Sequence, residues 1–255
     1  MRRAGRKRPD SYVSRSYRRL VACGDLVVTR VRVKETDLHI LADRDVTAMA
    51  RNLVVECRLQ LENHIAKDPH FAFSLTPVAT EPIAAPIVRE MLQAGRDAGV
   101  GPMAAVAGAV ARYVGEGLMR LGVTELIVEN GGDIFLHRHK DCTVAIFAGR
   151  SPLSNTVGLR LGRQAMPCGV CTSSGTVGHS LSFGDADSVT VVAESTALAD
   201  AAATRLGNEV GRGGGGRAGV NRALEQAARI AALRGVLVIC NEVMGAAGDI
   251  ELVRL

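Results

Sequence analysis

Apolar and polar residues alternate with two different periods along the chain, and each change of period marks an expected element. Residues 26–41 alternate with a period of two, interrupted at 34–35, which predicts strand structure on both sides of that point. Residues 46–65 place apolar side chains on one helical stripe, and Asp45 can cap the helix that this pattern predicts. We expect this helix to end before Pro69 and a second helix to cover 87–98.

The central and C-terminal parts continue the same mixture of elements. Residues 99–122 begin with a Gly-Pro turn and predict a helix rich in alanine, valine and glycine, so something must pack very close to it. Strands are expected at 125–129, 134–138, 143–148, 155–161, 188–193, 236–240 and 250–253, with helices at 195–210 and 220–233 and a glycine-rich connector at 211–219. Hairpin-paired strands and paired helices indicate an α+β fold with antiparallel sheet.

Charge is distributed unevenly. The formal net charge is +5, but arginines concentrate in residues 1–19, and the rest of the chain is slightly acidic. We therefore expect residues 1–16 to form a basic, disordered tail and residues 17–255 to form one compact domain. An acidic partner could bind the tail, whereas a body without excess positive charge disfavours nucleic-acid binding.

Composition and cysteine usage indicate a cytoplasmic protein. Hydrophobic residues make up 47% and charged residues 22%, as in ordinary globular chains, and no segment has the length and apolarity of a membrane span or secretory signal. The six cysteines lie mostly in apolar surroundings and are expected to be reduced thiols. Cys168 and Cys171 have CxxC spacing, but a zinc site needs a second ligand pair, so a metal or redox function is disfavoured.

Residues 171–208 carry most of the candidate chemistry. The Ser173-Ser174-Gly175 turn combines hydroxyls with a flexible backbone, which suits an anion or phosphate. His179, set among small residues, is a candidate general acid or base. Asp200 and Thr204 are four residues apart on an expected helix, so their oxygens can face one hard cation such as Mg²⁺.

A second constellation, Glu129-Asn130-Gly131-Gly132-Asp133, joins two expected strands. Its simplest interpretation is a hairpin turn, because Asn-Gly is a strong turn signal. The flanking carboxylates also allow a ligand function, in which Glu129 would hydrogen-bond a heterocycle and the glycine amides would contact phosphate. Residues 99–103 indicate a weaker anion site at a helix N-terminus.

Taken together, these motifs resemble the ApbE superfamily, whose best-known members are FAD:protein FMN transferases. VENGGDI at 128–134, TSSG at 172–175, His179 and LADAAAT at 198–204 occur in the order of that superfamily. The resemblance to a cytosolic branch covers about residues 17–253 and includes KETDL at 34–38 and GVGPMAAVAG at 99–108. It implies a duplicated T-fold of two ββααββ units with antiparallel sheets.

The resemblance also implies a site. Asp200 and Thr204 would bind Mg²⁺ with a backbone carbonyl near Ala105–Ala107. The residues themselves make His179 and Glu129 the candidate catalytic groups. The candidate ligand-binding residues are Asn130, Gly131, Gly132, Asp133, Thr172, Ser173, Ser174, Gly175, Gly101 and Met103. Ala107-Gly108 replaces a lysine-glycine of the transferases, and their long insert between TSG and His is missing. The resemblance therefore implies binding of a nucleotide-like ligand more strongly than it implies flavin transfer.

Three functions follow from these residues. The first is binding of a flavin, FAD or FMN, or another nucleotide-like phosphate ligand with Mg²⁺, and nucleotidyl or phosphoryl transfer on it. The alternative is a T-fold lyase or hydrolase that acts on a purine-like or pterin-like heterocycle anchored by Glu129. The third is a non-catalytic ligand-binding or assembly protein, for which a homo-oligomer and an acidic partner are expected. The sequence leaves the substrate and turnover open.

Overall fold

The computed structural model describes residues 26–176, 184–211 and 215–255 of the chain. Its strands are β1 (Val27–Val33), β2 (Thr36–Ala42), β3 (Leu126–Asn130), β4 (Asp133–His137), β5 (Cys142–Ala145), β6 (Val157–Leu161), β7 (Cys168–Ser173), β8 (Ser188–Ala193), β9 (Leu233–Cys240), β10 (Val243–Gly248) and β11 (Glu251–Arg254). Its α-helices are α1 (Thr47–Lys67), α2 (His70–Phe73), α3 (Pro86–Ala98), α4 (Val106–Arg120), α5 (Thr196–Gly207) and α6 (Gly216–Ala227). Short 3₁₀ helices cover Pro102–Ala105 and Arg163–Ala165.

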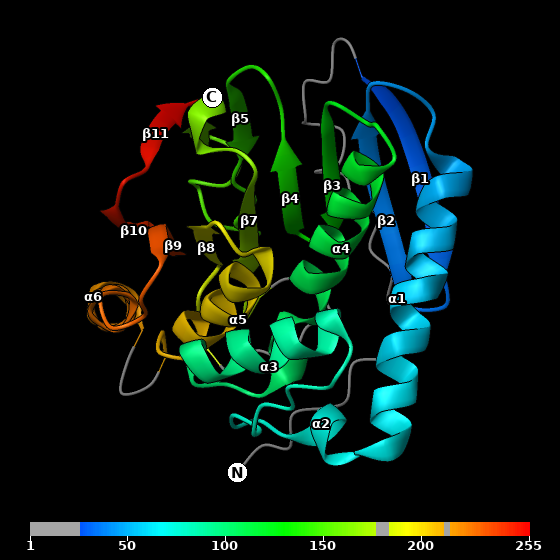
Figure 1. Cartoon of the computed structure of the whole chain (residues 1–255). Helices are drawn as coiled ribbons and strands as arrows, with labels where there is room; N and C mark the ends of the chain where they lie inside the picture. Colours follow the sequence, from blue (N-terminus) through cyan, green and yellow to red (C-terminus); the bar gives the residue numbers. More distant parts are fainter. Residues whose placement is uncertain (1–25, 177–183, 212–214) are drawn as a thin grey trace.

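The strands form two antiparallel sheets. The larger has eight strands in the order β1-β2-β3-β4-β7-β8-β9-β10, and the smaller has three in the order β11-β6-β5. Helices α1, α3, α4 and α5 lie on one face of the large sheet (Figure 1). Along the chain, two strands, helices and two strands occur twice, first from β1 to β4 and then from β7 to β10. The expected α+β fold with antiparallel sheet is confirmed.

Two apolar cores lie on the two faces of the large sheet. Successive side chains of a strand point to opposite faces, so Val128 packs under the helices while Ile127 packs towards the small sheet. Phe135 belongs to the helix-side core, and its neighbour Leu136 belongs to the other. The same alternation decides which residues of each functional motif can meet.

Several expected elements have the expected places. The β1–β2 hairpin turns at Lys34, whose φ is 52°. Arg58 of α1 donates to Thr36 Oγ1 (2.9 Å) and to Glu35 Oε2 (2.6 Å), so the KETDL motif fastens the hairpin to α1. Asp45 Oδ1 accepts the Thr47 N–H at 2.9 Å, at the start of the predicted amphipathic helix.

Three expectations were wrong. No strand was expected at β7 or β10: β7 is almost fully buried and shows no polar alternation, and β10 (VMGAAG) is poor in strand-forming residues but pairs with β9. The helix expected at 220–233 lies at Gly216–Ala227, and β9 begins at Leu233. The glycine-rich run 211–219 is therefore only partly a connector, because its last four residues belong to α6.

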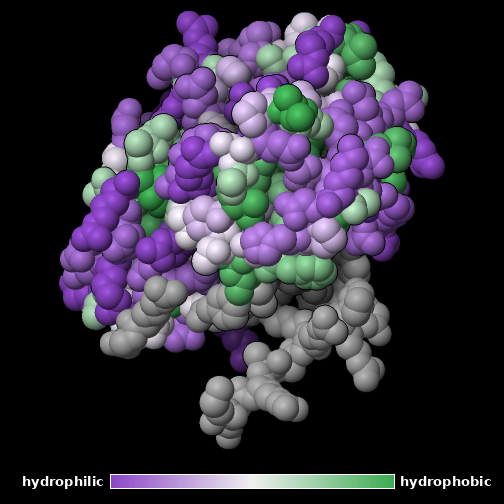
Figure 2. Space-filling model, turned by 60° about the horizontal axis from the view of Figure 1, so that its bottom comes forward, coloured by the Kyte–Doolittle hydropathy of each residue, from purple (hydrophilic) through white to green (hydrophobic). Residues whose placement is uncertain are grey.

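The exposed hydrophobic residues do not form a large patch on the face shown in Figure 2. Phe73, at the end of α2, and Ile83, between α2 and α3, are 79% and 92% exposed. Figure 2, with the bottom of Figure 1 turned forward, shows hydrophobic residues in separate spots among hydrophilic ones. Within the described ranges, no helix combines the length and apolarity needed to cross a bilayer.

Candidate functional site

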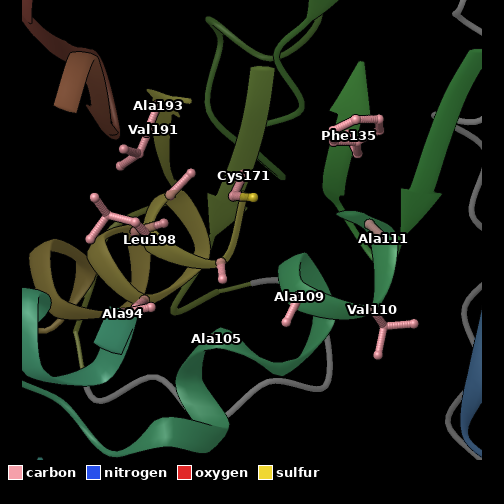
Figure 3. Packing of buried hydrophobic residues seen from close by; sticks show 14 of the residues in the cluster. Ala94, Ala105, Ala109, Val110, Ala111, Phe135, Cys171, Val191, Ala193 and Leu198 are labelled. Atoms are coloured by element: carbon pink, nitrogen blue, oxygen red, sulfur yellow. The ribbon is translucent and has the colours of Figure 1, made fainter. Parts of the chain in front are cut away.

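The candidate site lies at one end of the large sheet, where β4 begins and β7 ends. The β3–β4 turn, the start of α4 and the first half of α5 meet there (Figure 1). Figure 3 shows Cys171 projecting from β7, with Ala105 and Ala109 at the start of α4 and Leu198 on α5 nearby. Small side chains let these elements approach closely, as a Cβ on Gly108 would lie 2.4 Å from the Thr196 carbonyl oxygen. The predicted close packing on this helix is confirmed.

Asp200 joins α5 to the start of α4. Its Oδ2 accepts the Gly108 N–H at 2.9 Å, and the Ala107 N–H also stabilises the carboxylate. Ala105, the N-cap of α4, has no side chain that could do this, so Asp200 caps α4 from a neighbouring helix. Although the residue keeps some solvent contact, burial of its carboxyl group raises the pKa of Asp200 to about 7, against the opposing effect of these two N–H groups.

The β3–β4 turn is fixed to the same helix start. Gly131 and Gly132 have φ of 73° and 109° and form a two-residue loop between the paired residues Asn130 and Asp133, as the hairpin interpretation predicts. The Gly132 N–H donates to Glu129 Oε1 at 2.9 Å, and Asn130 Nδ2 donates to the Ala107 carbonyl at 3.1 Å. The turn therefore presents β4 to α4 in one fixed position.

Asp133 is a deeply buried carboxylate of the site. It pairs with Cys171 across β4 and β7, is 7% exposed, and its Oδ1 has no hydrogen-bond partner among the described residues. Burial raises the pKa of Asp133 well above its ordinary value, and the nearby charges of Asp200 and Glu129 raise it further. The two aspartates therefore lie close enough to influence each other's ionisation.

Cys171 belongs to this site, but Cys168 does not. The Cys171 thiol donates to the Thr196 carbonyl at 3.3 Å, and burial raises its pKa well above the ordinary value. Cys168 lies in the core on the other face of β7, and burial raises its pKa to about 11. The two thiols of the CxxC spacing thus point to opposite faces and cannot hold one metal ion together.

Strand alternation also divides the predicted ligand-binding residues between the two faces. Asn130, Asp133 and Ser173 lie on the helix side of the sheet with Cys171, whereas Glu129 and Thr172 lie on the other side. Thr172 Oγ1 is 2.9 Å from Thr190 Oγ1 on that far side.

The serine-rich turn that follows β7 is held by its own contacts. The Thr176 N–H donates to Ser174 Oγ at 3.2 Å, and the Gly175 N–H donates to the Ala186 carbonyl at 2.9 Å. Thr176 Oγ1 donates to Asp187 Oδ1 at 3.0 Å. His179 lies outside the described residues.

The remaining predicted residues have different surroundings. Thr204 follows Asp200 by one turn of α5 and is partly exposed. Ala105 is buried at the end of the 3₁₀ helix that precedes α4. A Cβ on Gly101 would lie 1.8 Å from the Ser74 carbonyl oxygen, so chain packing accounts for glycine there, and Met103 packs against the helix-side core.

The donor set at this end of the sheet suits a hard divalent cation. In the described part of the chain, no three His, Cys, Asp or Glu side chains form a metal-binding group. The two neighbouring carboxylates of Asp133 and Asp200, the Thr204 hydroxyl and the backbone carbonyls near Ala105 are nevertheless oxygen ligands of the kind Mg²⁺ prefers. The Oδ1 of Asp133 is a buried carboxyl oxygen without a partner among the described residues, and a cation would satisfy it.

Two residues of the site are not evident from the motifs. Cys171 precedes the TSSG motif, and its strand position places it beside Asp133. Gly108 is distinguished from its neighbours in sequence by no polar group, yet its N–H binds Asp200. Neither function is visible without the tertiary contacts.

Comparisons with known proteins identify the family of this chain. Residues 18–252 match the family described as AbpE bacteria. A UPF0280 protein of Methanocaldococcus jannaschii is 43% identical over 229 residues, covering 88% of this chain and 92% of its own, and one of Methanosarcina acetivorans is 40% identical over 220 residues, covering 86% and 85%.

Solved structures show the same fold at low sequence identity. The flavinyl transferase ApbE of Pseudomonas stutzeri in its apo form superposes with a TM-score of 0.52 at 15% identity, covering 87% of this chain and 94% of its own. The flavin transferase ApbE of Vibrio cholerae gives 0.52 at 15% identity, covering 87% and 96%. The chain therefore belongs to the family described as AbpE bacteria, an ApbE-like family.

Proposed function

We propose that this protein binds a flavin or another nucleotide-like phosphate ligand together with Mg²⁺ at the end of the sheet formed by β4 and β7. The observation that carries the proposal is the meeting of Asp200, the α4 N-terminus and a buried oxygen of Asp133 that has no partner among the described residues. The fold shared with two flavin transferases supports a flavin as the ligand class.

In this proposal each residue has a definite task. Asp200 and Thr204 hold the cation on one face of α5, with a carbonyl from the region of Ala105. When bound, Mg²⁺ would neutralise negative charge on a pyrophosphate and so favour phosphoryl or nucleotidyl transfer. Gly131 and Ser173 would orient the phosphate, since the amide and the hydroxyl lie at the same end of the sheet. His179 would carry the proton.

The heterocycle alternative relies on Glu129. Its Oε1 accepts the Gly132 N–H within its own hairpin, and its side chain starts from the sheet face opposite to Asp133. These two observations favour a structural contribution of Glu129 to the turn. A panel of purines and pterins in thermal-shift measurements separates the two functions, because only the alternative expects stabilisation by a bare heterocycle.

Predictions about domain organisation, location and partners accompany the proposal. The repeated order of strands and helices supports the division into two T-fold halves. A cytoplasmic location is inferred from the cysteine composition. The homo-oligomer and the acidic partner of residues 1–16 stay predictions, and the tail lies outside the described residues.

Titration of FAD with and without Mg²⁺ tests the proposal. We expect Mg²⁺ to strengthen FAD binding to the wild type, and we expect Asp200→Asn and Thr204→Val to remove this effect. Asp200→Asn keeps an oxygen that can cap α4, so a change reports the charge and not unfolding. Asp249→Asn, an exposed site in the turn before β11, is the matched control and should behave like the wild type. FAD binding that is equal in all variants and independent of Mg²⁺ would reject the metal.

A further inference from the structure

We propose that Asp133 is the second carboxylate ligand of the divalent cation, facing Asp200 from the sheet. This inference rests on the cation of the proposed function and adds a residue from the VENGGD turn to the metal ligands. It also assigns a cause to the burial of an aspartate in the first position of β4.

The placement of Asp133 follows from four contacts around it. Asp133 pairs with Cys171, and the Cys171 thiol reaches the Thr196 carbonyl at the start of α5. Asp200 is one turn further along α5, and its carboxylate ends on the Gly108 N–H. Asn130, which pairs with Asp133 in the hairpin, binds the Ala107 carbonyl beside Gly108. Asp133 is therefore enclosed by β7, α5 and the start of α4.

The unsatisfied oxygen of Asp133 calls for a ligand. The residue is 7% exposed, and no described residue binds its Oδ1. A buried polar atom without a partner costs about 1–3 kcal/mol, and more if the group is charged. A cation held between this oxygen and Asp200 would offset that cost.

The helix N-terminus explains why one carboxylate is not enough. The N–H groups of Ala107 and Gly108 already face Asp200, and the positive end of the helix dipole opposes a cation there. A single carboxylate that also accepts these N–H groups therefore binds a divalent ion less strongly than a carboxylate away from a helix N-terminus. With Asp133 the site has two carboxylates, which match the charge of the ion.

The donor atoms around the site favour a hard cation. The Cys171 thiol is engaged in a hydrogen bond to the Thr196 carbonyl, whereas Asp133 and Asp200 offer carboxyl oxygens. Oxygen ligands are those expected for Mg²⁺ or Mn²⁺.

Titration of metal-stripped, full-length protein with Mn²⁺ in the absence of nucleotide tests the inference. Isothermal calorimetry gives the affinity, and the EPR signal of free Mn²⁺ gives the number of sites. We expect one site in the wild type, at least about tenfold weaker binding in Asp133→Asn and in Asp200→Asn, and unchanged binding in the exposed Asp249→Asn control.

A second readout shows that the variants are folded. Without metal, Asp133→Asn should melt at or above the temperature of the wild type, because it replaces a buried carboxyl group that is crowded by neighbouring carboxylates. Mn²⁺ should raise the melting temperature of the wild type but not that of Asp133→Asn. Asp133→Ser, which also removes the carboxyl group, supplies an independent variant with the same expected loss of Mn²⁺ affinity.

The outcomes separate this inference from the proposed function. Wild-type affinity for Mn²⁺ in Asp133→Asn, or no Mn²⁺ site in the wild type, would overturn the assignment of Asp133. Mn²⁺ binding that needs both aspartates, in a protein that does not bind FAD, would confirm the cation site and reject only the ligand. FAD binding with Mg²⁺ that is unaffected by Asp133→Asn would reject this inference alone.

Discussion

The carboxylate of Asp200 accepts the backbone N–H of Gly108 at 2.9 Å and thereby caps α4 from α5. An aspartate that satisfies a helix N-terminus is already accounted for by structure, because the first N–H groups of a helix need partners. A metal ion at the same carboxylate would share it with the helix. The relationship links the stability of the α4–α5 packing to the occupancy of the proposed cation site.

Substitutions of Asp200 separate its cap from its charge. Asp200→Ala removes the acceptor of the Gly108 N–H and should lower the free energy of unfolding by about 1 kcal/mol, whereas Asp200→Asn should change it by less than about 0.5 kcal/mol. Urea denaturation of the metal-free protein measures both. An equal loss in the two variants would show that charge, and not the cap, is the structural contribution of Asp200.

Gly108 is expected to tolerate no side chain. A Cβ there would lie 2.4 Å from the Thr196 carbonyl oxygen and 2.9 Å from the Asp200 Cβ, so Gly108→Ala should destabilise the protein by about 2 kcal/mol. The sign of this change in the free energy of unfolding identifies the close contact, because Gly→Ala within a helix is otherwise stabilising.

The matched control for Gly108 is Gly215→Ala. Its Cβ would lie 4.0 Å from the nearest atom, Cys240 Sγ, and we expect a change within about 0.5 kcal/mol. Urea denaturation of both variants gives the comparison. A Gly108→Ala variant as stable as the wild type would mean that α4 and α5 can move apart.

Glu90 is expected to make stability depend on pH. Burial raises its pKa above the ordinary 4.5, against the lowering effect of Arg112, whose Nη1 lies 3.1 Å away. A group with a raised pKa in the folded state contributes stability below its unfolded pKa and loses it as pH rises through the folded value. The stability of the wild type relative to Glu90→Gln should therefore fall as the pH rises above the ordinary Glu pKa of 4.5.

Urea denaturation at several pH values measures this difference for Glu90. The exposed Glu242→Gln variant serves as the control and should give a flat difference across the same range. A wild-type advantage that grows with pH would instead show that the Arg112 ion pair outweighs burial.

Periodicity determined much of the fold before any tertiary contact was known. The hairpin at 34–35, the helix after Asp45 and the turn at 131–132 all follow from local patterns, because alternation and glycine conformation are properties of a short segment. Local patterns do not predict β7, because it is buried on both faces and shows no alternation of apolar and polar residues. β10 is a strand mainly because β9 pairs with it.

The candidate site also has features that local sequence predicts and features that depend on tertiary contacts. The motifs that carry oxygens can be read from the chain alone, and so can the position of Asp200 and Thr204 on one helical face. The folded molecule was needed to show that Asp133 lies near Asp200, that Glu129 starts from the opposite face of the sheet, and that Cys171 and Cys168 point apart. The physical reason is that strand alternation assigns each residue a face, but the register between β4 and β7 and the packing of α5 select which faces meet.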